Sequence, residues 1–127
     1  MPDWIVTKCS PRSVPETVQR MSELASAKGL KLFTVIDHSG EAAANGLELR
    51  DTKVVVFGSP VAGTPVMQAA PLAALDLPLK ILVWDDDGQT RVSYTAPAEL
   101  GVRYGLTDEL TGRLAGIDGI TDALVQG

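Results

Sequence analysis

The amino-acid sequence predicts a single α+β domain that extends over residues 1–127. The length of 127 residues and the hydrophobic content of 45% suit one globular domain with its own core. Apolar residues alternate with a period of two in some segments and recur at helical spacing in others. Strands and helices are therefore expected to follow one another along the whole chain.

The chain is expected to begin with a strand and a helix. Residues 3–9 alternate between two faces and predict the first strand. A helix begins after Ser13, because Ser13 and Glu16 have the spacing of a capping box, in which side chains satisfy free backbone amides. Apolar residues recur at helical spacing up to Gly29, a residue suited to end the helix.

Two more strands are predicted on either side of a short helix. Residues 30–37 form a strand with one mostly apolar face. Ser39 is expected to cap a short helix that ends at Asn45-Gly46. The β-branched run 53–57 then predicts a central strand.

A further helix and a hairpin follow. We predict that the helix begins at Thr64, which caps it, with Pro65 in the first position. Residues 79–84 predict another buried strand. Asp86-Asp87-Gly88 is a hairpin turn signal that leads to an alternating strand at 90–95.

Short helices complete the chain. Pro97 opens a helix that Gly105 ends, and Thr107 is expected to cap the next. Apolar residues share a helical stripe beyond Thr107, but the glycines within 112–119 lower the helix propensity. The last segment is therefore expected as one helix or as two.

Charge and hydropathy exclude several classes of function. Lys and Arg number 11 and Asp and Glu number 16, so the net charge is −5. Nucleic acid is excluded as a main partner, because its affinity rests on neutralisation of phosphates by Lys and Arg. No segment approaches 18 apolar residues, so we expect no membrane partner and a cytoplasmic location. The sequence indicates no cofactor.

Three blocks of the sequence resemble the domain-of-unknown-function 302 family. The resemblance implies a compact two-layer α/β sandwich, often a homodimer, and no established reaction. Together with the order of elements, it predicts a single mixed or antiparallel sheet with helices packed on one face. The blocks are residues 33–38 with Ala42, residues 56–68, and residues 77–88 with Tyr94.

Three positions depart from the pattern of that family. Ser59 and Thr95 stand where the family pattern has Asn, and Tyr104 stands where it has His. If those positions form a polar site in the family, this chain has an altered version of it.

His38 and Cys9 are the candidate side chains for ligand binding, nucleophilic attack or metal coordination. His38 is the single histidine and lies where a strand passes into a helix start, so it is a candidate ligand-binding residue; a capping or packing role is the alternative. Cys9 is expected to be a buried, inert thiol, with a nucleophile near His38 as the alternative. These two residues have no zinc-ligand spacing, so no metal is predicted. Residues 85–88 indicate a solvated turn rather than a calcium loop.

The segment 58–65 is the most informative part of the chain for a binding site. It joins a buried strand to a helix N-terminus, whose free amides suit an anion. It is not a phosphate-binding loop of the ATPase type, because Pro65 stands where that motif has lysine. The alternative is a structural turn with a Thr cap. Arg103 is a candidate carboxylate or phosphate clamp, with a surface ion pair as its alternative. The candidate ligand-binding residues are His38, Ser59, Thr64, Met67, Gln68 and Arg103.

The leading hypothesis is a small dimeric ligand-binding or regulatory domain. We expect a small polar or anionic ligand in a pocket that His38 and Thr64 share. We also expect a homodimer, since strands such as 79–84 leave a sheet edge that must be covered. An enzyme with His38 as general acid or base is one alternative. A protein–protein interaction module without a ligand is the other.

Overall fold

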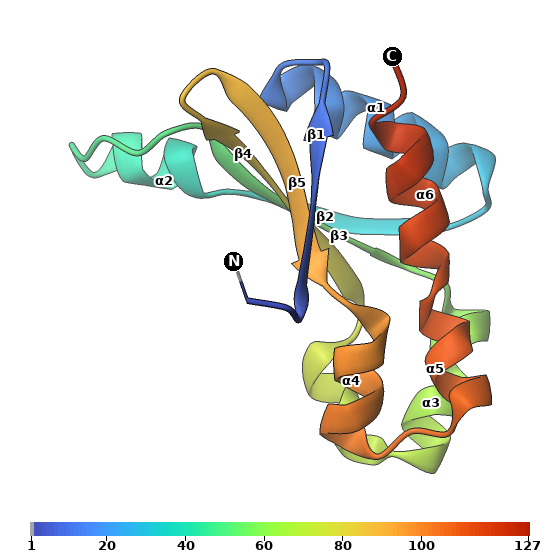
Figure 1. Ribbon diagram of the computed structural model, residues 1–127. Helices are drawn as coiled ribbons and strands as arrows, with labels where there is room; N and C mark the ends of the chain where they lie inside the picture. Colours follow the sequence, from blue (N-terminus) through green and yellow to red (C-terminus); the bar gives the residue numbers. More distant parts are fainter. Residues whose placement is uncertain (1) are drawn as a thin grey trace.

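The computed structural model describes residues 2–127 and confirms the α+β class. Its five strands form one sheet in the order β1-β5-β4-β3-β2 (Figure 1). All four pairings are antiparallel, which decides between the mixed and antiparallel alternatives. The strands are β1 (Ile5–Ser10), β2 (Lys31–Asp37), β3 (Thr52–Gly58), β4 (Leu79–Asp86) and β5 (Gln89–Thr95).

Two helices cover one face of the sheet, as predicted. Helix α1 (Val14–Ala27) packs against β2, β3 and β4, and α6 (Gly116–Leu124) lies beside β1 and α1. Lys8 on β1 joins α6 through an ion pair with Asp122 at 2.8 Å. The apolar core between the layers consists of Val14, Met21, Val55, Phe57, Ile81, Val83, Val92, Tyr94, Ile117, Ile120 and Leu124.

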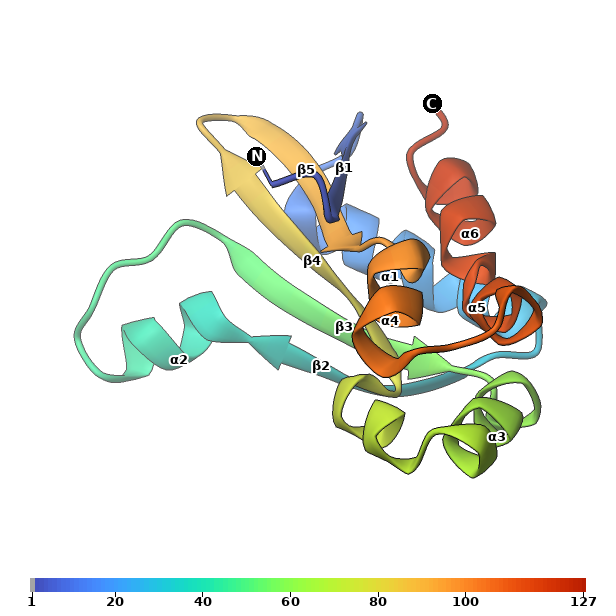
Figure 2. The same ribbon diagram turned by 60° about the horizontal axis from the view of Figure 1, so that its bottom comes forward.

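A second hydrophobic cluster lies at one end of the sheet. It is built by α3 (Pro60–Ala69), the 3-10 helix η1 (Pro71–Asp76), α4 (Pro97–Tyr104) and α5 (Asp108–Leu114). Its buried members are Val66, Ala73, Leu100 and Leu114. Figure 2 shows these helices gathered at the end of the molecule opposite α2.

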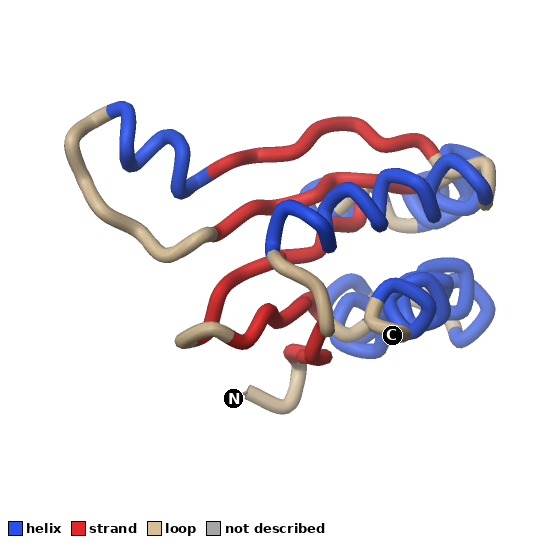
Figure 3. The backbone as a smooth tube through the Cα atoms, turned by 90° about the horizontal axis from the view of Figure 1, so that it is seen from above, coloured by secondary structure: helices blue, strands red, loops and turns tan. Residues whose placement is uncertain are grey.

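At the other end of the sheet, α2 (His38–Ala44) and the loop 45–51 connect β2 to β3. No residue of α2 is buried. Leu47 and Leu49 in the loop are 65% and 48% exposed. Viewed from above, α2 stands apart from the remaining helices (Figure 3).

Helix ends with one strong local signal form as predicted. Ser13 Oγ accepts the amide of Glu16 at 3.2 Å, which confirms the cap of α1. Gly105 ends α4 with a φ of 61°, a left-handed conformation that costs glycine little. The last segment is two helices, α5 and α6, and Thr107 caps the first of them.

Two predicted caps are wrong, each by a few residues. Asp37, not Ser39, caps α2, and its Oδ1 accepts the Gly40 amide at 2.9 Å. Ser59, not Thr64, caps α3, which begins at Pro60 and contains Pro65 in its interior. Pro60 also satisfies the preference for proline in the first turn, so the helix starts at the earlier of two equivalent signals.

Candidate functional site

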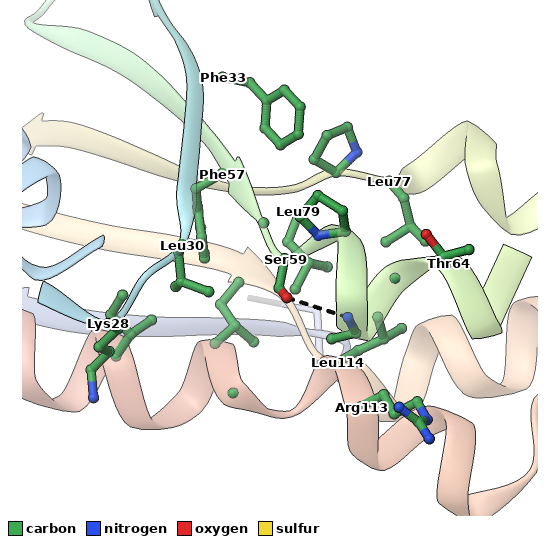
Figure 4. Close-up of a pocket in the computed structure, with 18 of the residues that line it drawn as sticks. Lys28, Leu30, Phe33, Phe57, Ser59, Thr64, Leu77, Leu79, Arg113 and Leu114 are labelled. Carbon is green, nitrogen blue, oxygen red and sulfur yellow. Dashed lines mark hydrogen bonds between the residues drawn. The ribbon is translucent and has the colours of Figure 1, made fainter. Parts of the chain in front are cut away.

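A pocket of about 650 Å³ lies where the second cluster meets the end of the sheet (Figure 4). Its walls come from four segments that are distant in sequence. The lining residues are Lys28, Leu30, Phe33, Phe57, Gly58, Ser59, Pro60, Ala62, Gly63, Thr64, Met67, Leu77, Pro78, Leu79, Arg113, Leu114, Gly116, Ile117 and Ile120. We call this the seam pocket.

The seam pocket lies between the two hydrophobic clusters. Phe57, Ile117 and Ile120 belong to the main core, whereas Leu114 belongs to the second cluster. Leu79 packs against both clusters. Protein interiors normally leave few voids larger than a water molecule. A pocket of this volume therefore shows that the two clusters do not pack fully against each other.

The first turn of α3 forms part of the wall, and the amides of Ala62 and Gly63 in it are already bonded. The Ala62 amide donates to Ser59 Oγ at 3.3 Å and the Gly63 amide donates to Ser59 O at 2.9 Å. Pro60 has no N–H to offer. Two of the amides predicted to face an anion are therefore already occupied, and Ser59 acts as the cap of the helix.

Three of the six predicted site residues line the seam pocket. They are Ser59, Thr64 and Met67. Gln68 is exposed on α3 and lies outside the lining. His38 and Arg103 lie elsewhere in the fold.

His38 and Thr64 do not share a pocket, so that prediction is wrong. His38 follows β2 and Thr64 follows β3, and these two strands are antiparallel. The C-terminal ends of antiparallel neighbours lie at opposite ends of a sheet, which separates the two residues by the length of the strands. His38 is exposed, and none of the hydrogen bonds described within residues 2–127 involves its imidazole.

Arg103 forms the surface ion pairs that were its alternative. Its Nη1 lies 2.9 Å from Asp76 Oδ2 and its Nη2 lies 3.4 Å from Glu99 Oε1. The Tyr104 hydroxyl donates to the same Asp76 oxygen. That hydrogen bond, together with Arg103, lowers the pKa of the Asp76 carboxyl. Arg103 and Tyr104 thus hold α4 against the end of η1.

Cys9 is exposed, which corrects the prediction of a buried thiol. It lies on the edge strand β1, and its Sγ accepts from Arg91 Nη1 at 3.1 Å. β1 and β2 are the two opposite edges of the sheet, so Cys9 is also far from His38. The alternative of a Cys9–His38 pair is excluded by this strand order.

Residues 85–88 form the predicted hairpin turn. The Gly88 amide donates to Asp85 Oδ1 at 2.9 Å, and Asp87 and Gly88 have φ values of 50° and 93°. Across residues 2–127, no group of three or more His, Cys, Asp or Glu side chains is placed to hold a metal ion. In the same range, no helix has the length and apolar character needed to cross a membrane.

The family model of the domain of unknown function DUF302 matches residues 6–124. The chain belongs to the DUF302 family. A crystal structure of an uncharacterized conserved DUF302 protein from Bacillus stearothermophilus has the same fold, with a TM-score of 0.83. The superposition covers 98% of this chain and 97% of that one, at 18% sequence identity.

This DUF302 chain is also similar to part of larger curated proteins. The fluoride-specific ion channel FluC 1 of Brucella suis biovar 1 is 38% identical over 103 residues, which are 80% of this chain and 41% of that protein. FluC 1 of Brucella abortus biovar 1 shows the same identity over 38% of its length. The chain thus spans about two-fifths of the curated relatives that it matches.

Sequence reasoning missed the wall of the pocket that the C-terminal helices supply. Arg113, Leu114 and Ile117 come close to the segment 57–67 only through tertiary packing. The apolar stripe at residues 110–124 showed that these helices bury one face. Nothing in that stripe indicated that the face ends at a pocket rather than in the core.

Proposed function

We propose that this DUF302 domain binds a small, largely apolar molecule in the seam pocket. The observation that carries the proposal is a pocket of about 650 Å³ between two hydrophobic clusters. Ligand sites in proteins are typically apolar concavities of roughly 300–1,000 Å³ with a few polar groups. The block 56–68, which carries part of the family resemblance, supplies one wall.

The same arrangement favours binding over catalysis. The polar side chains among the lining residues are two hydroxyl side chains, Ser59 and Thr64, and two basic ones, Lys28 and Arg113. His38, the candidate general acid or base, lies at the other end of the sheet. A general base must reach the proton that it removes within about 3 Å, or through one water molecule.

A pair of glycine substitutions tests the proposal. Gly116 lines the pocket and Gly119 does not, and a Cβ at either position meets no heavy atom within 4 Å. Both lie on α6, so Gly116→Phe and Gly119→Phe make the same chemical change in the same helix. Ligands found with the native chain in a thermal-shift screen of apolar metabolites are expected to lose binding in Gly116→Phe only. Equal binding by both variants would contradict a ligand site in the seam pocket.

We further propose that the domain is a homodimer that pairs through β2. The central position of β4 means that residues 79–84 are not the open edge we expected; β1 and β2 are the edges. On β2, Phe33, Val35 and Ile36 are between 37% and 43% exposed. An apolar, uncovered edge strand is a ready template for pairing with another strand. Antiparallel pairing of two β2 strands also brings Lys31 of each copy to the end occupied by Asp37 of the other.

Light scattering at micromolar concentration tests the dimer. The expected mass is twice the 13.4 kDa of one chain. Val35→Lys is expected to shift the mass to that of a monomer, because it places a charge in the middle of the paired strand. Val102→Lys on α4, where the native side chain is 81% exposed, is the matched control and should leave the dimer intact. A native mass of one chain would overturn the proposal.

A regulatory role beside a fluoride channel is a second candidate, favoured by the 38% identity with the Brucella proteins. In this proposal, occupancy of the seam pocket changes fluoride flux through an attached or associated channel. The test replaces the matched region of the Brucella suis protein with this chain and measures fluoride efflux from liposomes with and without a pocket ligand. Equal efflux with and without the ligand would count against the regulatory role.

The proposal also includes a cytoplasmic location, which fractionation of cells tests.

A further inference from the structure

The charged side chains that line the seam pocket are all basic. Among its described lining residues, Lys28 and Arg113 carry charge, and there is no Asp or Glu. This contrasts with the chain as a whole, which has 16 acidic and 11 basic residues. The pocket is therefore a locally positive opening on an acidic protein.

Both basic groups are available to a ligand. Lys28 is exposed, and the ion pairs and hydrogen bonds found within residues 2–127 leave its ammonium group without a partner. Within the described part of the chain, the ion pair of Arg113 is with Glu109 on the same helix, at 3.5 Å, and the Glu109 side chain is 79% exposed. Exposed pairs of this spacing stabilise a protein only slightly, so Arg113 can leave Glu109 and contact a bound anion with little loss of stability.

Two hydroxyl groups add hydrogen-bond donors to the wall. Ser59 Oγ accepts the Ala62 amide and keeps its own hydrogen to donate. Thr64 is exposed on the lining of the pocket. The polar groups around the opening thus offer more donors than acceptors, which suits an acceptor-rich anionic group.

Figure 4 places the two basic residues at opposite ends of the group of lining side chains, with apolar side chains such as Leu30 and Leu114 between them. The apolar body of a ligand can therefore cover the side chains between them, while its head group contacts a basic residue at one end.

We propose that the seam pocket binds an amphipathic anion, that is, a molecule with an apolar body and one carboxylate-like or sulfonate-like group. The apolar body lies between the two hydrophobic clusters, and the anionic group contacts Lys28 or Arg113 at the opening. This inference rests on the proposed function and specifies its ligand class.

Two fluorescent probes that differ by one charged group test the ligand class. 1-Anilinonaphthalene-8-sulfonate and N-phenyl-1-naphthylamine share the same apolar body, and only the first carries a sulfonate. The double variant Lys28→Gln/Arg113→Gln is expected to bind the sulfonate probe more weakly and to raise its dissociation constant by about fivefold or more. The neutral probe should change by less than about twofold, because its contacts are apolar. Dodecanoate should displace the sulfonate probe from the native chain better than dodecanol does.

Two controls separate the ligand class from the existence of the pocket. Arg50→Gln/Lys80→Gln removes two positive charges outside the lining and should leave both probes unchanged. Gly116→Phe should abolish binding of both probes, and Gly119→Phe should not. If the probes bind all variants alike, the seam pocket is not the site and the proposed function fails. If Gly116→Phe removes both probes but the Lys28/Arg113 double variant weakens neither or weakens both equally, only the anionic ligand class fails.

Discussion

The two ends of the sheet differ in what the chain builds after a strand ends. After β3, the chain forms α3 and η1, and α4 and α5 return to pack on them around a second hydrophobic cluster. After β2, it forms α2 and the loop 45–51, in which α2 buries no residue. Both junctions join a strand to a capped helix, but only at the first do further helices, α4 and α5, pack opposite the junction. A strand-to-helix junction therefore indicates a pocket only where another apolar layer lies opposite it.

The largest expected difference between the two ends is in stability. Leu100→Ala should lower the free energy of unfolding by about 2–4 kcal/mol, because Leu100 is buried in the second cluster and its removal leaves a cavity. Leu47→Ala in the loop should change it by less than about 0.5 kcal/mol, because that side chain is mostly exposed. Urea denaturation of the two variants measures both values. Equal losses would show that the α2 end is packed against something, such as a second copy of the chain.

A glycine substitution at each end gives the next largest contrast. A Cβ at Gly101 on α4 lies 2.5 Å from Thr111 Oγ1 and 3.2 Å from Thr111 Cγ2, so Gly101→Ala should cost about 1–3 kcal/mol. A Cβ at Gly40 meets the Asp37 carboxylate at 2.5 Å, but that side chain is exposed and can rotate to relieve the clash, so the loss in Gly40→Ala should be smaller. Thermal denaturation measures both. Thr111→Ala in the Gly101→Ala background should restore part of the stability, and an absence of rescue would place the clash elsewhere.

The pH dependence of stability should also differ between the ends. The pKa of Asp76 is lowered by the Tyr104 hydrogen bond and by Arg103, and that of Asp37 by the Gly40 amide and Ser39. Each carboxylate therefore stabilises the fold above its ordinary pKa of 3.8, and this stability is lost as the pH falls through the lowered folded pKa.

Denaturation of Asp76→Asn and Asp37→Asn between pH 2 and 7, roughly the range in which carboxylates titrate, measures these contributions. Asp76→Asn should remove a pH-dependent contribution on the order of 1 kcal/mol or less after solvent screening. Asp37→Asn should remove less, since its carboxylate is more exposed than that of Asp76. The reverse order would show that the α2 end is more tightly held than its exposure indicates.

The smallest expected effect belongs to His38. His38→Ala should shift the melting temperature by no more than about 1 °C, because the imidazole is exposed and lies away from the core. It should also leave binding of both fluorescent probes unchanged, since His38 is not part of the seam pocket. Loss of probe binding in this variant would show that His38 contributes to ligand binding and that the α2 end of the sheet forms part of the site.

The sequence predicted elements with a single local cause better than it predicted relations between elements. Ser13 and Gly105 have one interpretation each, and both form as expected. At α3, Pro60 and Pro65 offer the same signal, and local patterns do not decide which one starts the helix. The separation of His38 from Thr64 depends on which strands pair and in which direction. That is a property of long-range contacts, which periodicity does not report.

The strand order has a consequence for synthesis of the protein. β1 pairs only with β5, so Ile5 lies opposite Thr95, and the two halves of that ladder are separated by most of the chain. Domains are made from the N-terminus at about 5–20 residues per second. At that rate, several seconds pass between the synthesis of β1 and that of β5, while the strands of the pairs β2–β3 and β4–β5 follow one another much sooner. β1 is thus synthesised well before its partner, it is among the last strands to pair in the sheet, and a chaperone that binds nascent strands has its longest opportunity there.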